Sequence, residues 1–321
     1  MRRLTFDVGR LTLNALAVGL IAASSVHAQT SLVIVSGIGG EAKYTKAFGQ
    51  LSSALAEAAH GRAKLADTSI IWLGDTAASA AKSRWYSGLS TRVNVERVLD
   101  GLADRRDGQV VVVLIGHGSG EGPETRISLP GPDMTATDFA RVLSRFGNRR
   151  VAFINLTSAS GDMLPLVAAP NRVVMTATKS AFQRNESQFA RFFVDALSRD
   201  GADTDKDGRI SLLEAFKYAE SETKRYYETG GKLATENAQM ADEGQLAGRF
   251  FLNAGGGGVG AGSNARLTAL YAERSAFDDQ IQSLKKRKTQ MTADAYDAEL
   301  ERLLLALARK AREIRQLERG A

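Results

Sequence analysis

Two apolar runs of the sequence end in residues whose side chains could do chemistry. The run VVVLI at 111–115 is followed by a Gly-His-Gly segment that contains His117, and the run VAFIN at 151–155 is followed three residues later by Ser158. An imidazole can act as general base for a hydroxyl nucleophile when the two groups lie within hydrogen-bonding distance. His117 and Ser158 are therefore the candidate catalytic residues.

The pattern around these two runs predicts the elements that position them. The predicted strands are 32–36, 70–73, 111–115, 151–155 and 172–178, and the predicted helices are about 45–60, 93–102, 138–146 and 189–197. Apolar strands that alternate with helices predict an α/β fold, a mainly parallel sheet with helices on both faces. Because the carboxyl ends of parallel strands share one edge of the sheet, His117 and Ser158 would meet there if their strands are neighbours.

A second segment has the spacing of a metal site. Residues 203–214, DTDKDGRISLLE, match the calcium loop of an EF-hand, with carboxylates at positions 1, 3 and 5, glycine at 6, an aliphatic residue at 8 and glutamate at 12. The predicted oxygen ligands are Asp203, Asp205, Asp207, the backbone carbonyl of Arg209, Ser211 and Glu214. The cofactor predicted from this loop is Ca²⁺. Since a single loop of this kind is evident, a structural brace is favoured over a paired sensor.

Together these features resemble the caspase–legumain class of peptidases, which share the caspase–haemoglobinase fold. In that class the catalytic histidine lies in a His-Gly motif after one strand, as in LIGHGSG at 114–120, and the catalytic cysteine ends the next strand in an Ala-Cys-x-Ser-Gly pattern, which INLTSASG at 154–161 resembles. The segments 129–143 and 173–180 look like the intervening helix and the following strand of bacterial members. The resemblance covers about 31–250, and it implies a caspase-like domain over 29–252 with the family's catalytic dyad at His117 and Ser158.

The departure from the family pattern concerns the nucleophile. The chain contains no cysteine, and Ser158 stands where the resemblance implies the catalytic cysteine. A serine hydroxyl has a far higher pKa than a thiol, so it needs a placed base, an orienting partner for that base and an oxyanion hole. We therefore expect a non-catalytic pseudo-peptidase that serves as a binding or scaffold protein. The alternative is a hydrolase or peptidase with Ser158 as nucleophile and His117 as base, so whether the chain is an enzyme stays open.

Residues 1–28 have the pattern of a secretory signal peptide. They combine a basic start, an apolar stretch at 11–23 and the small-x-small sequence Val-His-Ala at 26–28. The alternative is a retained membrane anchor, for which the apolar stretch is short. The prediction is an exported protein, periplasmic or secreted, without a stable membrane span after cleavage.

The last part of the chain changes in character. Residues 253–265 form a glycine-rich linker, and residues 266–321 repeat apolar positions at helical spacing on both sides of a turn near Thr292. This pattern predicts a C-terminal α-helical hairpin or coiled coil. One interpretation is a module for oligomerisation or docking, and the other is a hairpin that folds back on its own domain.

The binding partners of the chain are predicted from the C-terminal segment and from the net charge. The segment 266–321 predicts an unknown protein partner or self-association. The net charge is +6, and the aromatic residues are not interleaved with the basic ones, so we do not expect nucleic-acid binding.

Overall fold

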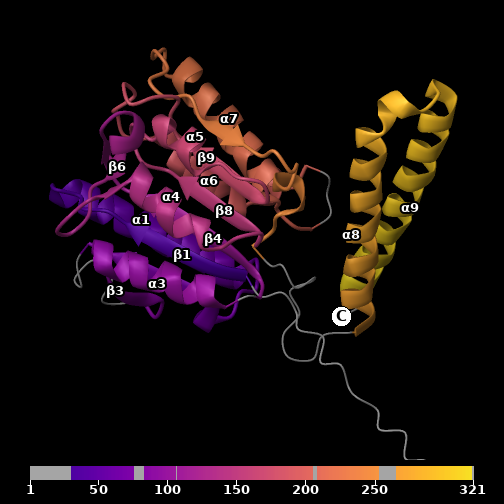
Figure 1. Ribbon diagram of the computed structural model, residues 1–321, viewed down its shortest axis with the longest axis horizontal. Helices are drawn as coiled ribbons and strands as arrows, with labels where there is room; N and C mark the ends of the chain where they lie inside the picture. The colour runs from indigo at the N-terminus through magenta and orange to yellow at the C-terminus, as the bar shows by residue number, and fades with distance from the viewer. Residues whose placement is uncertain (1–29, 76–82, 106, 205–207, 253–264, 320–321) are drawn as a thin grey trace, which may run out of the picture.

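The computed structural model describes residues 30–75, 83–105, 107–204, 208–252 and 265–319 (Figure 1). The predicted signal peptide 1–28 lies outside these ranges, as does 253–264 of the predicted linker. Two predicted calcium ligands, Asp205 and Asp207, also lie outside the described residues.

A seven-stranded sheet forms the centre of the α/β domain. Its strand order is β10-β9-β8-β4-β1-β2-β3, and every neighbouring pair is parallel except β10 and β9. The strands are β1 (Thr30–Ser36), β2 (Ile70–Gly74), β3 (Tyr86–Leu89), β4 (Gln109–Ile115), β8 (Val151–Asn155), β9 (Arg172–Thr176) and β10 (Gln239–Ala241). The predicted mainly parallel sheet is confirmed.

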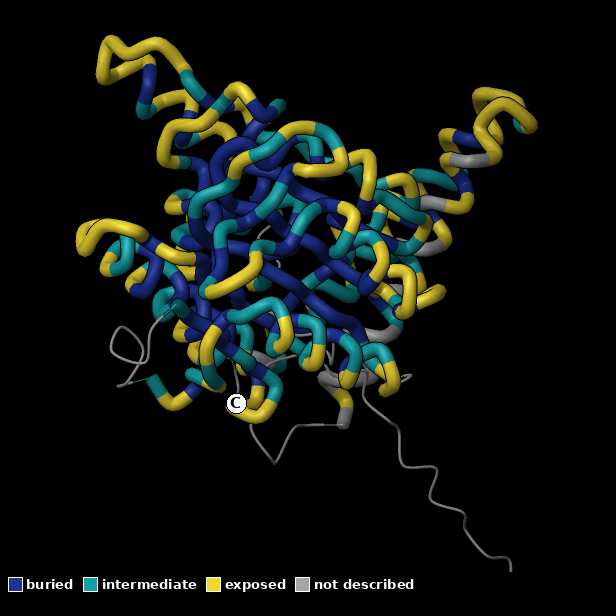
Figure 2. The backbone as a smooth tube through the Cα atoms, turned by 60° about the vertical axis from the view of Figure 1, so that its left-hand side comes forward, coloured by how far each residue is buried: buried dark blue, intermediate teal, exposed yellow. Residues whose placement is uncertain are grey.

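Helices cover both faces of this sheet, as predicted. One face packs against α1 (Ala42–Gly61), α6 (Gln188–Ser198) and α7 (Leu212–Thr229), and the other against α3 (Arg92–Asp104), α4 (Ala136–Ser144) and α5 (Leu164–Val167). Strand β4 shows how one apolar run serves both cores: Val111, Val113 and Ile115 face the first helix layer, and Val110, Val112 and Leu114 face the second. Figure 2 shows the buried residues concentrated in these central strands. Burial on both faces explains why the strands are apolar without alternation.

Short elements complete the domain. A small antiparallel sheet joins β5 (Gly118–Ser119), β6 (Arg126–Ile127) and β7 (Met134–Thr135) directly after β4. The domain's 3-10 segments are η1 (Asp67–Ser69), η2 (Gly122–Glu124), η3 (Gly161–Met163), η4 (Asp200–Ala202) and η5 (Ala247–Arg249), whereas η6 (Lys288–Gln290) lies in the C-terminal segment.

The C-terminal segment is a helical hairpin of α8 (Ala265–Lys286) and α9 (Ala293–Arg319), which confirms the predicted fold class for this part. The two helices bury apolar side chains against each other: Leu270 with Ile314, and Ile281 and Leu284 with Tyr296 and Leu303. No helix among the described residues is long and apolar enough to cross a membrane.

Candidate functional site

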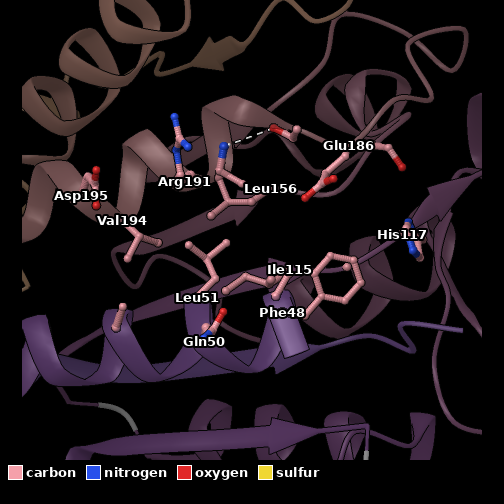
Figure 3. A pocket seen from close by; sticks show the side chains of 16 residues that line it. Phe48, Gln50, Leu51, Ile115, His117, Leu156, Glu186, Arg191, Val194 and Asp195 are labelled. Carbon is pink, nitrogen blue, oxygen red and sulfur yellow. Dashed lines mark hydrogen bonds between the residues drawn. The ribbon is translucent and has the colours of Figure 1, made fainter. Parts of the chain in front are cut away.

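The two candidate catalytic residues lie at one edge of the sheet because their strands are neighbours. Strands β4 and β8 pair in parallel, and Leu114 stands opposite Asn155 at their carboxyl ends. His117 follows β4 and Ser158 follows β8, each three residues beyond this matched pair. Both side chains line the same cavity, and Figure 3 shows His117 at one end of it.

The hydroxyl of Ser158 is bonded to backbone, not to imidazole. Its Oγ accepts a hydrogen bond from the Gly118 N–H at 3.2 Å and donates to the Gly118 carbonyl oxygen at 3.3 Å. The residue is only 4% exposed. Within the described residues, no hydrogen bond joins Ser158 to His117.

The ring of His117 is held by aromatic packing. Its centroid lies 4.6 Å from the Tyr44 ring and 5.0 Å from the Phe48 ring, in edge-on geometry. Both aromatic residues belong to α1. In the described part of the chain the imidazole has no hydrogen-bond partner, so no group orients it as a general base.

The carboxylate nearest in sequence to Ser158 is engaged elsewhere. Asp162 Oδ2 accepts a hydrogen bond from the Gly122 N–H at 3.1 Å, which ties η3 to η2. Asp162 therefore serves as a link between two loops at this edge of the sheet. It does not complete a catalytic triad in the present geometry.

Two glycines allow the loops to approach each other closely. A Cβ atom on Gly118 would lie 2.1 Å from the Ser158 carbonyl oxygen, and one on Gly161 would lie 2.1 Å from the Lys179 carbonyl carbon. Non-bonded atoms do not approach each other this closely, so any residue larger than glycine at either position would force the two backbone segments apart. The glycines of both sequence motifs thus have a packing role at this edge.

The small residues after β8 form a buried, fully anchored loop. All of residues 157–161 are buried. Thr178 Oγ1 accepts hydrogen bonds from the Ser160 N–H at 2.7 Å and the Gly161 N–H at 3.1 Å. Ala159 adopts a φ of 50°, and its N–H donates to the Gln183 carbonyl. Small side chains are required here because the loop runs between the end of β4 and the segment that follows β9.

The cavity beside the two candidate residues has a volume of about 330 Å³ and lies between α1 and α6. Its walls are mainly apolar and are formed by Phe48, Leu51, Ala54, Ile115, Leu156, Ala190 and Val194. Gln50, Glu186, Arg191 and Asp195 add polar groups (Figure 3). Sequence reasoning missed this cavity. The sequence indicates only that α1 and α6 are amphipathic, and this pattern does not show that the two helices face each other.

A buried carboxylate fixes the start of α6, which forms one wall of the cavity. Glu236 is 5% exposed and accepts hydrogen bonds from the Gln188 N–H at 2.8 Å, the Phe189 N–H at 3.2 Å and the Ser187 hydroxyl at 2.7 Å. The Tyr227 hydroxyl donates to it at 3.1 Å. Burial raises the pKa of Tyr227, since the anionic phenolate is poorly solvated there. A carboxylate is favourable at a helix N-terminus, so α6 begins at a defined point.

The predicted calcium loop is closed by hydrogen bonds among its described residues. Glu214 Oε1 accepts from the Thr204 N–H at 2.9 Å, and its Oε2 accepts from the Ser211 N–H at 2.9 Å. The Gly208 N–H donates to Asp203 Oδ2 at 2.8 Å, and Gly208 has a φ of 85°. The carboxylate oxygens of Asp203 and Glu214 are donors of the kind that a hard cation such as Ca²⁺ takes. Among the described residues, no three His, Asp or Glu side chains are grouped closely enough to hold a metal ion.

This loop lies at the opposite edge of the sheet from His117 and Ser158. Ser211 forms an isolated antiparallel bridge with Phe251, whose carbonyl oxygen accepts a hydrogen bond from the Gln109 side chain. The Gln109 side chain also donates to Thr30 Oγ1 at 3.0 Å. Gln109 and Thr30 are the first residues of β4 and β1, so the loop is tied to the amino ends of the central strands.

Comparison with known proteins gives limited similarity. No protein-family model and no curated protein match the chain. Among solved structures, the Drosophila initiator caspase Dronc has a TM-score of 0.47 and 11% sequence identity, over 79% of this chain and 99% of that chain.

Proposed function

We propose that this chain is a caspase-like protein that binds a ligand at the strand-end site without cleaving it. The observation that carries the proposal is the engagement of the Ser158 hydroxyl with both backbone polar atoms of Gly118 and not with His117. A serine becomes a nucleophile when an adjacent base accepts its proton. Here the proton is directed to a carbonyl oxygen, which is not a base of that kind.

The cavity between α1 and α6 supports a binding role. It is enclosed mainly by apolar side chains, and a few charged groups converge on it, a combination typical of small-molecule and side-chain binding sites. Arg191 and Asp195 lie one turn apart on α6 and can fix the polar end of a ligand whose apolar part enters the cavity. The ligand class that we propose is therefore an apolar group that carries a polar or charged end.

The alternative, hydrolysis through Ser158, is favoured by one specific feature. The Gly118 N–H lies 3.2 Å from Ser158 Oγ, to which it donates. On attack by Oγ, this N–H would have to turn to the oxyanion that forms on the adjacent carbonyl carbon, which is the role of an oxyanion-hole donor. Activity would require the His117 ring to leave its contacts with Tyr44 and Phe48 and to reach the hydroxyl. An orienting partner for the ring would still be needed.

A fluorophosphonate probe separates the two functions. An activated serine attacks the phosphorus atom through Oγ and expels fluoride, which leaves a covalent adduct that intact-mass analysis detects. We expect no adduct on folded protein with calcium present, while a serine hydrolase treated alongside is fully labelled. An adduct on the wild-type protein that is lost in both Ser158→Ala and His117→Ala would replace the binding proposal by the hydrolase.

We further propose one structural calcium site in the loop 203–214 of an exported protein. Its support is the donor set of the loop and the position of the loop at the amino ends of β1 and β4, away from the cavity. Ca²⁺ at that site would neutralise the Asp203 and Glu214 carboxylates and hold the loop against the sheet. A brace at that edge stabilises the domain without acting on the opposite edge.

A further inference from the structure

The outer face of α9 carries a pair of exposed leucines. Leu304 is 47% exposed and Leu305 is 53% exposed, near the middle of the helix Ala293–Arg319. The side of α9 that contacts α8 is different, because Tyr296, Leu303 and Ile314 are buried there. The two leucines are therefore not part of the hairpin's own core.

Charges of opposite sign flank the leucine pair along the helix. Asp297 and Glu301 precede it, Arg309 and Arg312 follow it, and all four residues are exposed. In the part of the chain that the structure describes, none of the four forms an ion pair. By contrast, charged residues near the contact between the helices are paired: Lys310 with Glu273 at 2.9 Å and Arg266 with Glu313 at 3.7 Å.

Helical spacing places these residues on one face. Positions 297, 301, 304, 308 and 312 follow each other at intervals of three and four, so they form a single stripe, with Leu305 and Arg309 at its side. The stripe has Asp297 and Glu301 in its first half, Leu304 in the middle and Ala308 and Arg312 in its second half, with Arg309 beside it. Such a surface is complementary to itself when a second copy runs in the opposite direction.

The antiparallel register is fixed by this arrangement. When Leu304 of one copy lies opposite Leu305 of the other, Asp297 lies opposite Arg312 and Glu301 lies beside Arg309. A parallel pair would place like charges opposite each other, which is unfavourable. The antiparallel pair is a two-fold symmetric interface, in which the same patch serves both copies.

We propose that two copies of this chain associate through the outer faces of their α9 helices, antiparallel and centred on Leu304 and Leu305. The interface buries the exposed leucines and pairs four charges that have no ion-pair partner among the described residues of one hairpin. The two hairpins then form a four-helix arrangement with its two-fold axis at the leucines. The site between α1 and α6 is not part of this interface.

Sedimentation velocity on protein produced from the full sequence tests the association. We expect a concentration-dependent dimer for the wild type and a monomer for Leu305→Glu, with the helical content of both unchanged by circular dichroism. Val93→Glu is the matched control, because Val93 is a 72% exposed apolar residue on α3 and its substitution leaves the dimer intact. A wild type that is monomeric at every concentration, or a dimer that survives Leu305→Glu, overturns the proposal.

Disulfide cross-linking tests whether the two α9 helices run antiparallel. Because the chain has no native cysteine, only introduced cysteines can form disulfides. Positions 297 and 312 are about 22 Å apart along one helix, so a disulfide between them can only join two copies. We expect Asp297→Cys/Arg312→Cys to form a disulfide-linked dimer under mild oxidation, while each single variant stays largely uncross-linked. Efficient cross-linking of the single variants, without a gain in the double variant, would mean a parallel pair and overturn the antiparallel interface.

Discussion

The Ser158 hydroxyl and the backbone of Gly118 form a reciprocal pair, in which Oγ accepts from the Gly118 N–H and donates to the Gly118 carbonyl oxygen. Gly118 directly follows His117, so Ser158 bonds to the backbone beside the imidazole that could act as its base. This contact joins the loop after β4 to the loop after β8, and these two strands are neighbours in the sheet. The serine therefore has a clear structural role at the position where the family resemblance implies a nucleophile.

The first prediction concerns this structural role. Ser158→Ala removes one donor and one acceptor from a buried contact and leaves the Gly118 groups without that partner. We expect a loss of about 1–3 kcal/mol in the free energy of unfolding, measured by urea titration at fixed protein concentration. Ser221→Ala is the control, because Ser221 is exposed on α7, and its effect should stay within about 0.5 kcal/mol. Equal stability of Ser158→Ala and the wild type would contradict the structural role of the contact.

The second prediction concerns the glycine of the His-Gly motif. An alanine at position 118 would bring its Cβ to 2.1 Å from the Ser158 carbonyl oxygen and 2.6 Å from Thr157 Oγ1. Because backbone must move to relieve this contact, we expect Gly118→Ala to lose at least about 3 kcal/mol of unfolding free energy, or to yield no folded protein.

Gly101→Ala is the matched control for that substitution. Gly101 lies in α3 with open space around its Cα, and alanine has the higher helix propensity. This variant should gain about 0.5–1 kcal/mol in unfolding free energy. If both glycine variants shift stability alike, close approach of the two loops is not what requires Gly118.

The strands that were predicted are those buried on both faces. β1, β2, β4, β8 and β9 are short apolar runs, because helices cover both sides of the sheet. β3 and β10 were missed because YSGL and QMA are short edge segments whose strand conformation depends on a single neighbour. The two-residue strands β5 to β7 are too short to show any periodicity.

The site was predictable in its location but not in its contacts. Parallel strands must end at one edge, so the sequence was enough to expect His117 near Ser158 if β4 and β8 pair. The contacts of the two side chains depend on parts of the chain distant in sequence: Tyr44 and Phe48 come from α1, far before the His-Gly motif. Local spacing holds no information on how α1 packs against that motif.

The third prediction tests the cavity as a binding site. Ala54 is a half-buried residue of α1 that lines it, so the indole of Ala54→Trp should fill part of the volume. The probe is 1-anilinonaphthalene-8-sulfonate, which combines apolar rings with one charge. We expect saturable fluorescence enhancement with the wild type and affinity at least about tenfold weaker, or about 1.4 kcal/mol, with Ala54→Trp.

Ala140→Trp controls for a general effect of the added indole. Ala140 is also half-buried, but it lies on α4, which covers the other face of the sheet. Its titration should match the wild type. Identical affinities for all three proteins would exclude this cavity as the binding site of the probe.

The last prediction concerns the calcium loop, and it uses two acidic residues three positions apart. Asp203 is the first residue of the loop pattern and accepts a hydrogen bond from the Gly208 N–H, whereas Asp200 lies just outside the pattern and pairs with Arg62. Calcium at about 1 mM should raise the melting temperature of the wild type over that in chelator, since a ligand that binds only the folded state stabilises it. Asp203→Asn keeps an acceptor for Gly208 but removes the charge, so the calcium-dependent rise should largely vanish. Asp200→Asn should retain the full rise, because its carboxylate is not a predicted ligand. A melting temperature that does not respond to calcium in the wild type, or an undiminished response in Asp203→Asn, would rule out the loop as the site.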